Sequence, residues 1–183
     1  MSRIPLITKH QDLAAAQQHF FDRIIRTRGR VPEPFQALLN SPEVAERLAS
    51  IGDFLLYDTV LSPAVKTLTW LIAARENDCE YAWAASVPHA RQAGVPEKLV
   101  NAIWNGQPLA GLTREQQLLI DFCHQLLRGN HHISDPAYRA AVEHFGTAAT
   151  VQIAATIGYF VMMACVLNAF EVAPQTTGPE PQL

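Results

Sequence analysis

The sequence predicts an all-α protein, and three observations lead to this fold class. Signals that begin helices recur along the chain, as at Ser41-Pro42 and Ser62-Pro63, where a capping hydroxyl precedes a proline at the first helical position. Apolar residues repeat at helical spacing, as in the run from Leu118 to Leu127. Alternating β-branched runs joined by hairpin turns, which are typical of strands, are absent from the sequence.

The first predicted helix lies near the N-terminus and has one apolar and one basic face. Arg23 and Arg26 lie on its solvent face, so they do not indicate a nucleic-acid site. A further helix is predicted after Ser41 and another after Ser62. The apolar stripe of the first helix consists of Leu13, Phe20, Phe21, Ile24 and Ile25.

A helical hairpin is predicted at the centre of the chain. Its first helix runs from Pro63 to about Asn77, and its second from Cys79 or Glu80 to Ala93. A short helix follows Gly94-Val95-Pro96. This hairpin is the segment on which the functional predictions below depend.

Three more helices are predicted in the second half. Thr113 and Gln116 have capping-box spacing, and Gly129 marks the end of the helix that they begin. Another helix runs from Ser134-Asp135-Pro136 to about His144, and an uncharged segment follows over 147–170. This segment is long enough to cross a membrane, but its small and polar residues favour a buried central helix.

The composition of the chain limits the classes of protein to which it can belong. The chain has 183 residues, of which 49% are hydrophobic and 17% charged, and a net charge of -3. We therefore expect one all-helical domain over 1–173, a disordered tail over 174–183, no nucleic-acid partner and a homo-oligomer that buries apolar surface. Three dispersed cysteines and the lack of a signal peptide predict the cytoplasm, with no membrane association.

The second helix of the hairpin carries the candidate chemical groups. Cys79, Ala82, Ser86 and His89 fall within a stripe of about 80° at the helical spacing of roughly 100° per residue. A pocket there would combine an apolar floor with a thiol, a hydroxyl and an imidazole. Two aromatic residues, Tyr81 and Trp83, flank this stripe.

This hairpin resembles the carboxymuconolactone decarboxylase family, which shares the alkylhydroperoxidase-D-like fold. The resemblance lies in Leu71-Ile72-Ala73-Ala74-Arg75, in Cys79-Glu80-Tyr81-Ala82-Trp83-Ala84-Ala85 and in Ala90-Arg91-Gln92-Ala93-Gly94-Val95. It extends through the capped helix at Thr113 to Ile157-Gly158-Tyr159. It implies a multi-helix domain with a central hairpin, assembled as a trimer or hexamer; a dimer stays open.

The chain departs from the family at the positions that carry its chemistry. Redox members use a Cys-x-x-Cys-x-x-x-His pattern, which reads Cys79, Ala82 and Ser86 here, so no resolving thiol lies three residues on. Decarboxylating members resemble one another in a histidine at the position of Ser86 and often a glutamate at that of Ala82. The departures leave His89, one turn beyond Ser86, as the substitute acid–base group.

The resemblance implies a carboxymuconolactone decarboxylase-like protein that acts without a cofactor, with lyase-type chemistry on a small cyclic or carboxylated metabolite. The predicted catalytic residues are His89, Tyr81 and Ser86. The predicted substrate-binding residues are Trp83, Cys79, Arg91 and His132. No metal is expected, because the histidines of the second half lack a ligand spacing typical of metal sites.

Two other hypotheses stay open, so whether the chain is an enzyme is not decided by its sequence. The first is a non-catalytic relative that binds a ligand or a partner. The second is a peroxidase-like redox protein that uses Cys79 alone with an external thiol.

Overall fold

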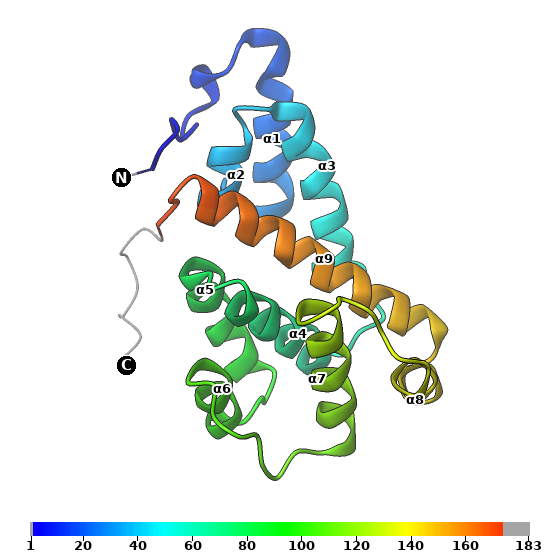
Figure 1. Cartoon of the computed structure of the whole chain (residues 1–183). Helices are drawn as coiled ribbons and strands as arrows, with labels where there is room; N and C mark the ends of the chain where they lie inside the picture. The colour runs from blue at the N-terminus through cyan, green and yellow to red at the C-terminus, as the bar shows by residue number, and fades with distance from the viewer. Residues whose placement is uncertain (1, 174–183) are drawn as a thin grey trace. The chain divides into compact units, whose positions relative to one another are not determined.

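The computed structural model describes residues 2–173, and the predicted tail over 174–183 lies outside the described residues. The described part of the chain is helical and contains no strand, which confirms the predicted fold class (Figure 1). The described residues group into two compact units, residues 2–58 with 165–173, and residues 59–164. The single domain expected over 1–173 therefore stays a prediction, and each unit is described by itself.

The second unit contains the predicted hairpin, made by α4 (Pro63–Glu76) and α5 (Glu80–Gln92). The Ser62 hydroxyl accepts a hydrogen bond from the Val65 backbone N–H at 3.2 Å, which caps α4 as the sequence predicts. Eight residues of α4 are buried, so this helix forms the core of the unit. Pro88 lies inside α5, where it removes one backbone N–H from the helix.

Three helices complete this unit: α6 (Glu97–Trp104), α7 (Arg114–Leu127) and α8 (Asp135–Phe145). Thr113 caps α7 through the predicted capping box, with reciprocal hydrogen bonds to Gln116 of 3.2 and 3.0 Å. Gly129 follows the end of α7 with a φ of +63°, a conformation that glycine adopts without strain. The helix signals of the second half are therefore confirmed to within one or two residues.

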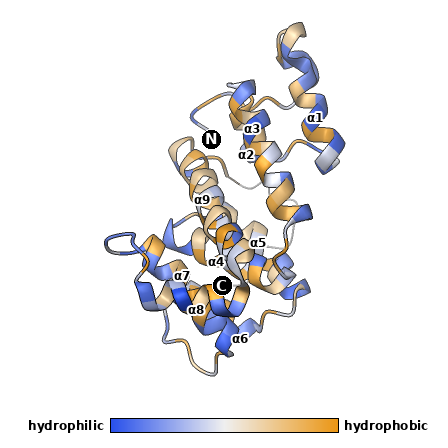
Figure 2. Cartoon of the chain, turned by 90° about the vertical axis from the view of Figure 1, so that its right-hand side faces the viewer, coloured by the Kyte–Doolittle hydropathy of each residue, from blue (hydrophilic) through white to orange (hydrophobic). Residues whose placement is uncertain are grey.

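The uncharged segment forms the long helix α9 (Thr147–Ala169), which belongs to the second unit up to Ala164 and to the first from Cys165. Its length and composition would suffice to cross a membrane, and half of its most apolar stretch is buried in the structure. Figure 2 colours α9 white to orange along its length, as expected of a helix without charged residues. Buried core helices of soluble proteins share these properties.

The first unit contains three α-helices: α1 (Gln18–Arg28), α2 (Glu33–Leu38) and α3 (Pro42–Asp53). Two short 3₁₀ turns, η1 (His10–Asp12) and η2 (Ala15–Gln17), precede α1, and a π-helical turn, η3 (Phe54–Asp58), extends α3. Arg28 forms a buried ion pair with Asp53 at 2.6 Å. The sequence predicted α1 and α3, whereas it gave no signal for α2 or η3.

Candidate functional site

The predicted catalytic face of α5 is largely closed inside the second unit. Cys79 is the N-cap residue of α5 and has 1% exposure, while Ser86 is fully buried. The Ser86 hydroxyl donates a hydrogen bond to the backbone carbonyl of Trp83 at 2.8 Å. These groups therefore lie within the hairpin, and their predicted roles in binding and catalysis stay predictions.

Aromatic rings pack against residues of α5 at two places, at Trp83 and, as described below, at His89. Trp83 is buried and packs against Trp104 of α6, with ring centroids 4.9 Å apart. Tyr81 is half-buried on the same helix. These rings form an apolar wall beside the first turns of α5.

His89 lies apart from the buried groups of its helix, because its side chain is exposed. Its ring stacks on Trp70 of α4 at 5.5 Å, and Trp70 in turn stacks on Phe160 of α9 at 4.6 Å. The indole N–H of Trp70 is buried and has no hydrogen-bond partner among the described residues. The sequence placed His89 and Ser86 on one face, whereas the structure gives the two side chains opposite exposure.

Arg91 is exposed and already paired with a carboxylate. Its Nε and Nη2 atoms donate to Glu97 of α6 at 2.8 and 2.7 Å. These hydrogen bonds raise the pKa of Arg91 and lower that of Glu97. A substrate carboxylate at this position would have to share the guanidinium with Glu97.

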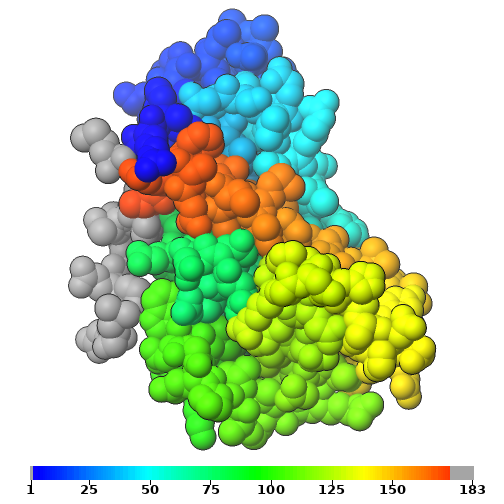
Figure 3. Space-filling view, in the orientation of Figure 1, coloured from blue at the N-terminus to red at the C-terminus, as the bar shows by residue number. Residues whose placement is uncertain are grey.

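His132, the last predicted site residue, lines a surface cavity of about 440 Å³, widely open to solvent, between the end of α7 and the start of α8. The chain segment that forms this cavity lies on the face of the second unit shown in the space-filling view, in yellow-green and yellow (Figure 3). The cavity joins two imidazoles, a guanidinium and several neutral polar groups. Its lining residues are His124, Gln125, Arg128, Gly129, Asn130, His132 and Ser134.

Two hydrogen bonds hold the loop around this cavity. The Gln125 side chain accepts a hydrogen bond from the Ser134 backbone N–H at 2.8 Å, which ties the start of α8 to α7. The ring Nδ1 of His131 lies 3.0 Å from the Leu126 carbonyl oxygen. The loop that carries His132 is therefore anchored at both ends on α7.

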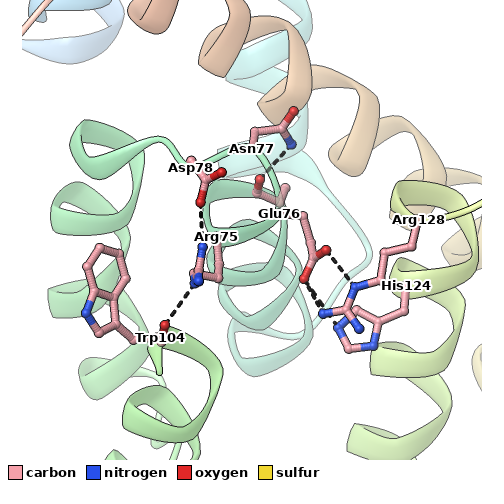
Figure 4. Close-up of polar contacts among 8 residues, drawn as sticks. Arg75, Glu76, Asn77, Asp78, Trp104, His124 and Arg128 are labelled. Carbon is pink, nitrogen blue, oxygen red and sulfur yellow. Dashed lines mark hydrogen bonds and ion pairs between the residues drawn. The ribbon is translucent and has the colours of Figure 1, made fainter. Parts of the chain in front are cut away.

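A charged cluster borders the cavity from the side of α4. Figure 4 shows Glu76, the last residue of α4, directed toward Arg128 and His124 of the α7 end. Arg128 donates from Nε and Nη2 to the two carboxylate oxygens of Glu76 at 2.6 and 2.5 Å. The Nε2 atom of His124 lies 3.7 Å from the same carboxylate.

The cluster shifts the protonation of its members. The hydrogen bond from Arg128 lowers the pKa of Glu76, so this carboxylate stays ionised. Burial, followed by the charge of Arg128, lowers the pKa of His124, whose imidazole is therefore neutral near pH 7. A neutral imidazole and a fixed guanidinium thus share one cavity wall.

The remaining nucleophiles and ligands add no second site. Cys123 of α7 is fully buried, and this burial raises the pKa of its thiol far above its usual range. No group of three or more histidine, cysteine, aspartate or glutamate side chains within residues 2–173 is placed to hold a metal ion. Cys165 of α9 is an exposed free thiol.

The sequence predicted His132 as a substrate contact but missed Glu76 and Arg128. Their positions could be read from the sequence, since Arg128 precedes the C-terminal glycine of α7 and Glu76 ends α4. Their contact could not, because it depends on how α4 packs against α7. The contact is the property that gives the cavity its charge.

Comparisons with known proteins agree with this fold. Residues 42–120 match the model of the carboxymuconolactone decarboxylase family. No curated protein sequence matches the chain.

Three solved structures share the fold at low identity. A peroxidase-related protein from Ralstonia eutropha with the alkylhydroperoxidase AhpD core is 19% identical, with 96% of this chain and 93% of that one covered and a TM-score of 0.77. A peroxidase-related protein from Silicibacter is 21% identical over 94% and 93%, with a TM-score of 0.72. The debrominase Bmp8, crystallised as a cysteine-to-alanine variant with 2,3,4-tribromopyrrole, is 14% identical over 96% and 94%, with a TM-score of 0.74.

Proposed function

Because the chain belongs to the carboxymuconolactone decarboxylase family, with the AhpD-like fold, we propose that it performs cofactor-independent, lyase-type chemistry on a small cyclic or carboxylated metabolite. The observation that carries this proposal is the cavity of about 440 Å³ lined by His124, Arg128 and His132. Its volume lies in the range of small-molecule sites, and its lining combines two imidazoles with a guanidinium.

The chemistry of the proposal is proton transfer. His124 is neutral near pH 7 because burial lowers its pKa, so it can accept a proton from a carbon beside a carbonyl group. When a substrate loses CO₂, the electron pair of the broken C–C bond enters a conjugated carbonyl, and the resulting enolate carbon then takes a proton from water, which a neutral imidazole can relay. Acid–base groups placed in this way contribute about 10²–10⁴-fold to a rate.

The α5 face is the rival location for the same reaction. There His89 would exchange the proton, while Tyr81 and Ser86 would orient the carbonyl. Trp83 and Cys79 would line the substrate pocket, and Arg91 would hold the carboxylate of the substrate. The buried Ser86 and Cys79 make this location less accessible than the cavity at His132. The experiment below separates the two locations.

A non-catalytic ligand-binding or partner-binding relative is the second candidate function. The observation that favours it is the closed α5 face, where the Ser86 hydroxyl is committed to a backbone carbonyl. Such a protein would bind small carboxylates in the cavity and return them unchanged.

A redox or dehalogenating protein that uses Cys79 is the third candidate. The debrominase relative supports it, since a cysteine was replaced in the structure that holds its brominated ligand. Cys79 begins α5, where the helix dipole favours a thiolate, although its exposure of 1% requires the helix start to open.

The test is a time course of ¹H NMR spectra with a panel of lactone acids and aromatic carboxylates. We expect substrate loss with the wild-type protein, and a fall of at least a hundredfold in rate for His124→Gln and His132→Ala. His89→Ala serves as the matched control and should retain the rate. Loss of activity in His89→Ala alone would move the reaction to α5, and binding without turnover would leave the ligand-binding function.

We further propose that the protein is cytoplasmic and assembles as a homo-oligomer, as its reduced cysteines and apolar composition suggest. Light scattering after size-exclusion chromatography measures the subunit number. A monomer at micromolar concentration would contradict the oligomer.

A further inference from the structure

The guanidinium of Arg128 has a second edge that the protein does not use. A guanidinium carries five N–H donors, arranged so that two neighbouring edges can each hold one carboxylate in a bidentate manner. Glu76 occupies the edge formed by Nε and Nη2. The two N–H groups of Nη1 and the second of Nη2 have no acceptor among the described residues.

Arg128 borders the cavity, whereas its partner Glu76 does not. The side chain of Arg128 is 57% exposed, and that of Glu76 is 15% exposed. Arg128 is therefore the partner of this pair that a ligand in the cavity can reach. Glu76 also fixes the orientation of the fork, so a ligand need not order a free side chain.

We propose that the Nη1–Nη2 edge of Arg128 is a binding subsite for one carboxylate group of a small ligand. The rest of the ligand would lie in the cavity toward His132 and Ser134, with His124 beside the guanidinium. The carboxylate would accept two N–H hydrogen bonds from the side of the guanidinium that Glu76 does not contact. The preferred ligand is thus a planar carboxylate with a polar ring or chain.

The subsite also restricts the reaction, and this consequence rests on the proposed function. A bidentate pair with a guanidinium stabilises the carboxylate charge, and that stabilisation is lost when the carboxylate leaves as CO₂. The carboxylate held by Arg128 is therefore one that the product keeps. A substrate that is decarboxylated therefore needs a second carboxylate. The C–C bond between this second carboxylate and the ring breaks, while the first carboxylate stays bound to Arg128.

Arg91, the arginine of the rival α5 location, separates the two locations, and the exposed Arg114 at the start of α7 is the control for any surface guanidinium. Arg91 binds Glu97 through the same two atoms, Nε and Nη2, as Arg128 uses for Glu76. Neither Arg91 nor Arg114 lines the cavity. A ligand that recognises any surface arginine would bind all three, whereas a ligand of the cavity needs Arg128 alone.

The experiment measures binding of 5-oxotetrahydrofuran-2-carboxylate by isothermal titration calorimetry and by ligand-observed NMR. We expect it to bind the wild-type protein and Arg114→Gln with equal affinity, and Arg128→Gln at least tenfold more weakly. Weaker binding to Arg91→Gln alone would place the acid on α5 and overturn the subsite. The primary amide of the same ring, which has the shape without the charge, should not bind. Equal affinity for Arg128→Gln, equal affinity of acid and amide, or no binding to the wild type would overturn the subsite.

Further measurements show whether a loss of binding reflects the subsite itself and not misfolding or turnover. Arg128→Lys retains the charge but cannot form two parallel hydrogen bonds, so its affinity should also fall about tenfold, with an unchanged circular dichroism spectrum. Inorganic phosphate that binds more tightly than the acid would reassign the subsite to a phosphate group. Calorimetry detects binding whether or not turnover occurs, so failure of the proposed reaction does not imitate failure of the subsite.

A labelled monoacid tests the retained carboxylate separately. The corresponding ring acid with a double bond conjugated to the lactone carbonyl, and with ¹³C in its carboxylate, should release no ¹³CO₂ in the presence of the protein. Release that Arg128→Gln abolishes would contradict the retention of this group.

Discussion

The pair between Glu76 and Arg128 should couple the two residues energetically more than a similar surface pair does. The perturbation is a double-mutant cycle of Glu76→Gln, Arg128→Gln and the double variant. The pair consists of two short charge-assisted hydrogen bonds, and the Glu76 side chain is 15% exposed. Each variant alone leaves one charge without its partner, whereas the double variant leaves none.

The expected coupling follows from the burial of the two partners. Hydrogen bonds to charged groups contribute about 1.5–3 kcal/mol, and fully exposed pairs about 0.2–1 kcal/mol. Arg128 is more than half exposed, so solvent screens its side of the pair. We therefore expect a coupling free energy of about 1–2 kcal/mol. In a chain of this length each kcal/mol corresponds to a change of roughly 2–4 °C in melting temperature.

Urea unfolding followed by circular dichroism measures this cycle. The control is the same cycle for Arg91 and Glu97, which share the bidentate geometry but have side chains that are 58% and 49% exposed. The coupling of the control pair should be smaller and should vanish in 1 M salt. A coupling for Glu76 and Arg128 no larger than that of the control pair would refute the argument from burial.

The remaining predictions concern protonation, thiol access and a helix cap. Since burial lowers the pKa of His124, the unfolded chain binds a proton that the folded chain does not, so the free energy of unfolding should fall below about pH 6.5, by at most about 1.4 kcal/mol per pH unit. Urea unfolding at several pH values should give a shallower slope for His124→Gln; identical slopes would exclude His124 as the source. Alkylation with iodoacetamide at pH 7.5, followed by mass spectrometry, should modify exposed Cys165 much faster than buried Cys79, and rapid reaction of Cys79 would revive the redox function. Thr113→Ala should lower stability by about 1 kcal/mol, since it removes the cap of α7, while an unchanged melting temperature would mean that the capping box contributes nothing.

The helices of this chain were predictable because capping residues in the local sequence mark where they begin. Ser62 and Thr113 accept hydrogen bonds from the first turns of α4 and α7, as their spacing indicates. Helix α2 was not predicted, since it begins at Glu33 after Pro32, which offers no capping side chain, and all six of its residues are buried. Tertiary burial, not a local signal, stabilises such a short helix.

The candidate site was only partly predictable, for a physical reason. Helical spacing correctly puts Cys79 and Ser86 on one buried face, but it cannot say whether that face opens to a cavity. The contact between Glu76 and Arg128 joins positions 52 residues apart in the chain. No periodicity links them, so the charge of the cavity wall becomes visible only when α4 and α7 are packed.

The most direct test of the account is an NMR titration of the histidine Cε1–H signals, assigned by single substitutions, with 5-oxotetrahydrofuran-2-carboxylate. A ligand in the cavity should move the signals of His124 and His132, whose rings line it, and leave that of His89 in place. Movement of the His89 signal alone would contradict the account, because it would put the ligand on α5 and leave the cavity empty.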